Sequence, residues 1–101
     1  MKIKFRDVNI GAVQSRAVIE ITPGVFLNEV TILKKGNDVE IELPQKSFKG
    51  KDGKLHYINI ISFANKDKEI LWKLEIKHEY LKWRKENPQV FIYESKDAKE
   101  K

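Results

Sequence analysis

The chain has 101 residues, of which 41% are hydrophobic and 35% are charged, so it can form one small domain with a single modest core. It contains no cysteine, which excludes disulfide bridges and thiolate metal sites and fits a reducing compartment. The first residues alternate charged and apolar types without the apolar core of a signal peptide, and no apolar run reaches membrane-spanning length. We therefore expect one domain over residues 1–94, a charged and disordered tail over residues 95–101, and a soluble, cytoplasmic protein that does not enter a membrane.

Alternation of apolar and polar residues predicts about five strands in the first two thirds of the chain. They are expected at residues 3–10, with a bulge near Asp7, and at residues 17–21, 25–33, 39–43 and 55–63. Turn signals rich in glycine, proline and asparagine separate the first four strands. The fifth run is apolar on both faces at residues 58–61, so we expect it to be covered on both sides.

A long helix is predicted after the strands, over residues 66–86. Asn65 is a suitable N-cap, and the helix is expected to end before Pro88. A short apolar run at residues 90–93 suits either a sixth strand or a segment docked on another subunit. These elements predict an α+β fold: an antiparallel sheet of about five strands with a long C-terminal helix and a short final strand.

Helical spacing divides the apolar residues of this helix into two stripes. One contains Ile70, Leu74 and Leu81, with Leu71 at its margin, and the other contains Trp72, Ile76, Tyr80 and Trp83. Because one stripe is enough to cover the protein's own sheet, the aromatic stripe is expected to need a second surface. Three such surfaces are open: another subunit, the run at residues 90–93, or stacked nucleic-acid bases. We favour another subunit, which predicts a homodimer.

A basic segment at residues 43–54 is expected to form a loop between two strands. Its cations are Lys46, Lys49, Lys51 and Lys54, and Phe48 lies among them. Together with a net charge of +5 and a pI near 9.4, the lysines suit an anionic partner such as nucleic acid. A lysine-rich hairpin that only keeps a sheet edge soluble is the commoner explanation of such a loop taken alone.

Several short motifs follow one another in a consistent order over residues 3–81. They are the strand and turn at residues 19–22, the run at 25–32, the turn at 35–37, the strand that ends in Leu43-Pro44-Gln45-Lys46, the turn Asp52-Gly53-Lys54, and the helix up to Tyr80. In this order and spacing they resemble the SpoVG (stage V sporulation protein G) family of small bacterial regulators. The resemblance implies an antiparallel sheet with a C-terminal helix, a dimer, and DNA or RNA binding in gene regulation.

The sequence offers no catalytic constellation. Its two histidines, His56 and His78, have no carboxylate partner at metal-ligand spacing, and the alternating acids of residues 38–42 are equally typical of a solvated strand face. No nucleophile motif or phosphate-binding glycine loop is present. We therefore expect a protein that is not an enzyme, with no cofactor, metal or small-molecule substrate.

Two functions from different classes remain. The first is a dimeric regulator that binds DNA or RNA, with Lys46, Lys49, Lys51 and Lys54 on phosphates and Phe48 inserted or stacked. The second is a structural or protein-interaction dimer without nucleic-acid binding. Salt dependence of binding separates the two, because phosphate contacts weaken steeply as salt rises.

Overall fold

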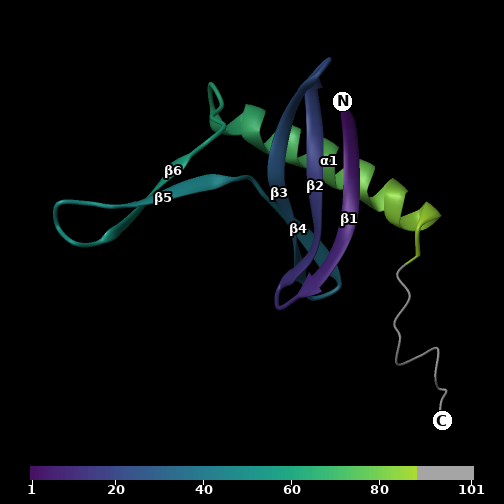
Figure 1. Ribbon diagram of the computed structural model, residues 1–101. Coiled ribbons are helices and arrows are strands. Elements are labelled where there is room, and N and C mark those ends of the chain that lie inside the picture. The colour runs from purple at the N-terminus through teal and green to yellow at the C-terminus, as the bar shows by residue number, and fades with distance from the viewer. Residues whose placement is uncertain (89–101) are drawn as a thin grey trace, which may run out of the picture.

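The computed structural model describes residues 1–88 as a four-stranded sheet, one long helix and a two-stranded arm (Figure 1). The larger sheet has the order β1-β2-β3-β4 and consists of β1 (Lys2–Ile10), β2 (Val13–Thr22), β3 (Val25–Lys35) and β4 (Asp38–Glu42). The arm pairs β5 (Gln45–Lys49) with β6 (Leu55–Asn59), and helix α1 spans Lys66–Glu86. The predicted α+β fold is confirmed, with six strands in place of about five. The predictions for residues 90–93 and 95–101 lie outside the described residues.

All neighbouring strands of the larger sheet are antiparallel and consecutive in the chain, so short turns join them. The register of β1 against β2 shifts between Asp7 and Ile10, where Asn9 takes a positive φ of 53°. The predicted bulge near Asp7 is therefore confirmed. A bulge at this point adds twist and bends the end of the sheet.

The core lies between this sheet and α1. On β2, alternate residues Ser15, Ala17 and Ile19 are buried and face the helix. On β3, Leu27 and Val30 are also buried although they lie an odd number of residues apart. The β2–β3 register shifts between their partners, and Glu29 has a φ of 61°, so a bulge returns the strand to the same face. Bulges thus explain why β3 lacks a regular alternation.

Helix α1 begins and ends where local signals in the sequence place it. The Asn65 side chain accepts a hydrogen bond of 3.0 Å from the Lys68 backbone N–H, which satisfies one of the free donors of the first turn. At the other end, Asn87 donates its backbone N–H to the carbonyl oxygens of Trp83 and Arg84. The predicted N-cap and the predicted bounds of 66–86 are confirmed.

The helix packs on its sheet with the stripe that was expected to face another subunit. Ile76 and Tyr80 are at most 1% exposed, and Trp72 and Trp83 pack against the same core. The Phe5 ring lies 5.2 Å from Tyr80 and 5.5 Å from Trp83. The assignment of this stripe to a dimer interface was therefore wrong, because the aromatic side chains fit the protein's own sheet. The other stripe, Ile70, Leu71, Leu74 and Leu81, is the exposed one.

The arm leaves the compact part of the molecule between β4 and α1. In Figure 1 it projects sideways, away from the sheet and the helix, and its two strands are linked by a narrow loop. Every residue of β5 and β6 is exposed. The prediction that residues 58–61 are covered on both sides was wrong for Ile58 and Ile60, which are both more than half exposed. The predicted loop at residues 43–54 was also too long, because residues 45–49 form β5.

Candidate nucleic-acid interface

The four predicted lysines are distributed along the arm. Lys46 and Lys49 lie on β5, whereas Lys51 and Lys54 belong to the tip, which we define as residues 50–54. Two backbone hydrogen bonds close the tip: the N–H of Gly50 donates to the Lys54 carbonyl at 2.9 Å, and the N–H of Gly53 donates to the Gly50 carbonyl at 3.0 Å. The tip is thus a closed turn that carries cations at the far end of the arm.

Phe48 lies on the same arm as the lysines but is not isolated. It pairs directly with His56 across the arm, and the two rings stack with centroids 5.3 Å apart and an interplanar angle of 23°. Phe48 nevertheless stays 43% exposed. The His56 Nε2 atom is in turn 3.1 Å from Asp52 Oδ1. One face of the arm therefore presents a fixed aromatic pair that is accessible to a flat ligand such as a base.

The positive charge of the arm is not neutralised from within the described part of the chain. Residues 45–59 contain four lysines and one acid, Asp52, which gives the arm a formal charge of +3 of the chain's +5. The Asp52 carboxylate accepts the Lys54 backbone N–H at 2.9 Å and lies beside His56, and these contacts lower its pKa. Within residues 1–88, none of the four lysine ammonium groups forms an ion pair.

A second group of cations lies on the open face of the sheet, which is the face away from α1. Lys2, Lys4 and Arg6 alternate along β1 with Ile3, Phe5 and Asp7, whose side chains face the helix. Arg6 is the direct cross-strand partner of Arg16 on β2. Like charges in this position destabilise a sheet unless an anion lies between them. These residues were not among the predicted contacts, although their spacing of two along β1 is visible in the sequence.

Two shallow hollows lie between the cations of β1 and β2 and the base of the arm, and none of the four arm lysines lines either of them. One, of about 280 Å³, lies over β1 to β3 and is lined by Lys4, Arg6 and Arg16. The other, of about 520 Å³, reaches from Arg16 to Ser47 and Tyr57 on the arm. Glu29 and Glu42 line the second hollow as well, and Glu29 lies 3.9 Å from Arg16. Because Glu29 lines both hollows, carboxylates as well as cations lie between β1 and the arm.

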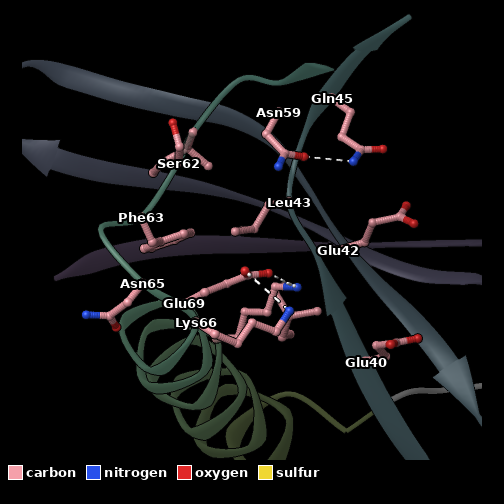
Figure 2. A pocket seen from close by; sticks show the side chains of 13 residues that line it. Glu40, Glu42, Leu43, Gln45, Asn59, Ser62, Phe63, Asn65, Lys66 and Glu69 are labelled. Carbon is pink, nitrogen blue, oxygen red and sulfur yellow. Dashed lines mark hydrogen bonds and ion pairs between the residues drawn. The ribbon is translucent and has the colours of Figure 1, made fainter. Parts of the chain in front are cut away.

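A further groove runs on the other side of the arm's base, beside β4 and the start of α1 (Figure 2). Glu69 occupies its floor and pairs with Lys73 at 3.0 Å and with Lys66 at 3.5 Å, which lowers its pKa chiefly through the hydrogen bond from Lys73. Near the arm, the Gln45 side-chain amide donates to Asn59 Oδ1 at 2.8 Å. These polar groups pair with one another across the groove.

Two further findings concern the described residues alone. Over residues 1–88, no group of three or more histidine, cysteine, aspartate or glutamate side chains is placed to hold a metal ion. Helix α1 is too polar to cross a membrane, and the same part of the chain holds no other helix of sufficient length.

Comparison with protein-family models, with curated proteins and with solved structures finds no match to this chain. The resemblance of its motifs to the SpoVG family therefore stays a prediction. The function is inferred below from the arm and the open face.

Proposed function

We propose that this protein is a non-enzymatic regulator that binds DNA or RNA and works as a homodimer. The arm makes the principal contact, with Lys46, Lys49, Lys51 and Lys54 on backbone phosphates and Phe48 against a base. Phosphate contacts of this kind supply most of the affinity and little sequence discrimination.

The observation that carries this proposal is the unneutralised charge of the arm. Four ammonium groups are held on an exposed projection, and within residues 1–88 no carboxylate pairs with any of them. On the helix, four of the six lysines pair with an acid, namely Lys66, Lys73, Lys77 and Lys82. The counter-charge of the arm is therefore best supplied by a polyanion.

The open face supports the same proposal. A phosphate bound between Arg6 and Arg16 would relieve their repulsion, and both guanidinium groups offer the planar donors that phosphate prefers. Glu29 lies 3.9 Å from Arg16, so a phosphate bound there would replace Glu29 as the partner of this guanidinium. The motifs that resemble the SpoVG family point to the same class of function.

Fluorescence anisotropy with single- and double-stranded oligonucleotides at two salt concentrations tests the proposal. The test variant replaces Lys46, Lys49, Lys51 and Lys54 by glutamine. A matched control replaces four exposed lysines elsewhere, Lys34, Lys68, Lys82 and Lys85, so both variants lose the same charge. We expect the arm variant to lose affinity and salt dependence and the control to keep most of both.

Equal affinity of the two variants would remove the arm from the site. A wild type that binds neither oligonucleotide at low salt would favour the second candidate function, a protein-interaction dimer. One observation favours that candidate: Leu55, Ile58 and Ile60 are aliphatic, more than half exposed and unsuited to stacking on bases.

A further inference from the structure

The outer side of α1 carries an apolar stripe that no other part of residues 1–88 covers. Ile76 and Tyr80, on the opposite side of the helix, are buried against the sheet. The outer stripe consists of four large aliphatic side chains that are between 46% and 64% exposed, namely Ile70, Leu71, Leu74 and Leu81. Along one side of one helix they form a continuous patch, which marks an interaction surface. A helix that is apolar on two opposite sides fits between two surfaces, of which its own sheet is one.

Two charges of opposite sign lie at the ends of the outer stripe. Asp67 is in the first turn of α1 and Lys85 is in its last turn, and both are exposed. They are 18 residues apart, which is five turns of about 3.6 residues, so they lie on one line along the helix. Leu74 lies close to the same line, since it follows Asp67 by nearly two turns. Within residues 1–88, neither Asp67 nor Lys85 forms an ion pair.

These positions are symmetric about Ile76. Asp67 and Lys85 are each nine residues from it, and Leu71 and Leu81 are each five residues from it. If two copies of α1 pack antiparallel about a two-fold axis at this level, each residue lies opposite the one that is equally far beyond the centre. Asp67 then lies opposite the partner's Lys85, and Leu71 lies opposite the partner's Leu81. Opposite charges would pair at both ends, with leucines between them.

We propose that a second copy of this chain covers the outer stripe: two α1 helices pack antiparallel about a two-fold axis level with Ile76. This inference rests on the homodimer of the proposed function and names its interface. The arm comes just before the helix, because β6 ends at Asn59 and α1 begins at Lys66, so the two arms lie at opposite ends of the dimer (Figure 1). The arm residues that the proposed function places on nucleic acid take no part in the contact and stay exposed.

The size of the contact predicts its strength. Residues 67–85 extend over about 27 Å of helix, and two helices packed side by side at about 8–10 Å cover both outer stripes. A groove of about 230 Å³ between Val39, Ile70 and Leu74 widens the surface towards β4. One helix per copy still gives less area than the roughly 800 Å² per partner of a standard interface. We therefore expect a reversible dimer with a dissociation constant on the order of micromolar.

Analytical ultracentrifugation without nucleic acid tests the apolar part of this interface. The wild type should show a monomer–dimer equilibrium, and Leu74→Asp and Leu81→Asp should each weaken self-association by at least about tenfold, because a charge replaces a buried leucine. Ile10→Asp, at an exposed residue of the β1–β2 turn, is the matched control and should associate like the wild type. Circular dichroism shows whether each variant is folded. A wild type that is monomeric up to about 100 µM, or a test variant that associates as strongly as the control, would overturn the proposal.

A charge exchange tests the register and separates it from the effect of the helix dipole. Asp67→Lys and Lys85→Asp each place like charges opposite one another and should weaken self-association about three- to tenfold. The double variant with both substitutions restores opposite charges and should recover most of the affinity. The helix dipole favours an acid in the first turn and a base in the last, so it predicts that the double variant is the least stable to denaturation. A double variant that does not recover self-association would contradict the proposal.

Disulfide trapping tests the antiparallel direction, and the chain has no native cysteine to interfere. Mild oxidation of mixed Leu71→Cys and Leu81→Cys chains should give a cross-linked dimer. Either variant alone should not, because its two cysteines would lie ten residues, or about 15 Å, apart along the helix pair. A mixture that cross-links no better than either variant alone would rule out this arrangement.

All three measurements are made without nucleic acid, so their failure is distinguishable from failure of nucleic-acid binding. A dimer that the helix substitutions leave intact would overturn this interface and keep the homodimer, whereas a monomeric wild type would overturn both. The control of the lysine experiment lacks Lys85, so its binding to oligonucleotides is measured at a concentration at which it is still a dimer.

Discussion

The guanidinium of Arg84, near the end of α1, forms a bidentate ion pair with the carboxylate of Asp7 on β1. The two residues are 77 positions apart in the chain. Nη1 donates to Asp7 Oδ2 at 3.2 Å, and Nη2 also donates to the Tyr80 hydroxyl at 2.8 Å and to Ser15 Oγ at 3.2 Å. The ring of Trp83 lies below the guanidinium at 4.8 Å. This cluster fixes the last turns of the helix to β1 and β2, where the sheet is bent by its bulge.

Stability should fall in acid because of this pair. The hydrogen bond from Arg84 lowers the pKa of Asp7 below its ordinary value of 3.8, so Asp7 binds protons less readily in the folded state than in the unfolded one. Its contribution is fully present above the unfolded pKa and is lost as pH falls through the lower, folded pKa. Urea unfolding between pH 7 and pH 3 measures the effect. The wild type should lose stability below about pH 4 more steeply than Asp7→Asn; parallel curves would show that Asp7 does not contribute.

Removal of the Tyr80 hydroxyl should destabilise the fold. This oxygen lies 2.9 Å from Ser15 Oγ and accepts a hydrogen bond of 2.6 Å from the Gln14 side chain. Tyr80→Phe keeps the ring in the core but leaves buried Ser15 with fewer partners, at a cost of about 1–2 kcal/mol in the free energy of unfolding. Tyr57→Phe, at an exposed residue, is the control and should change stability by less than about 0.5 kcal/mol.

Loss of the helix cap should have a smaller, separate effect. Asn65→Ala removes the acceptor for the Lys68 N–H and should lower the free energy of unfolding by about 1 kcal/mol. Asn65→Asp keeps an acceptor oxygen and should retain most of the stability. Chemical denaturation of the three proteins under the same conditions decides between a capping role and a neutral surface position.

The arm tip should be sensitive to a single methyl group. A Cβ atom at Gly50 would lie 2.6 Å from His56 Nε2 and 2.9 Å from Asp52 Oδ1, so Gly50→Ala must displace the histidine. We expect changed NMR shifts for His56 and its stacking partner Phe48, with unchanged shifts for core residues. Ser47→Ala, on the same arm and exposed, provides the comparison. Unchanged His56 resonances in Gly50→Ala would argue against this tip geometry.

Each arm lysine should contribute separately to nucleic-acid affinity. Substitution of Lys46, Lys49, Lys51 or Lys54 by alanine should weaken binding and reduce the slope of log affinity against log salt by about one. The ratio of affinities for two unrelated sequences should change little, because phosphate contacts do not read bases. Folding should persist, since these lysines are exposed and unpaired within the described chain. A slope that is identical in all four variants and the wild type would exclude the phosphate contacts.

The sequence predicted those elements whose signals are local. The bounds of α1 follow from Asn65 and Pro88, and the bulge near Asp7 follows from a break in alternation within one strand. The orientation of the helix could not be predicted in this way. Both stripes have helical spacing, and the choice between them depends on contacts from outside the helix. Phe5, near the start of the chain, contacts Trp83, and Phe63, just before the helix, contacts Trp72.

The arm illustrates the same limit for the candidate site. Residues 45–49 are mostly polar and basic, with little preference for a strand, and they become one because residues 55–59 pair with them. The four lysines and Phe48 were predicted from composition, whereas the cations of the open face were not. Arg6 and Arg16 become neighbours only through the register of β1 against β2, which cannot be read from the sequence.

The place of the arm in the chain has an evolutionary consequence. All buried core residues come from the segments before and after residues 45–59, so the sheet and helix pack without any contribution from the arm. The arm is therefore an insertion between the end of β4 and the start of α1. Related chains could change the length or the sequence of this insertion, and so change their ligands, while the rest of the fold stays constant.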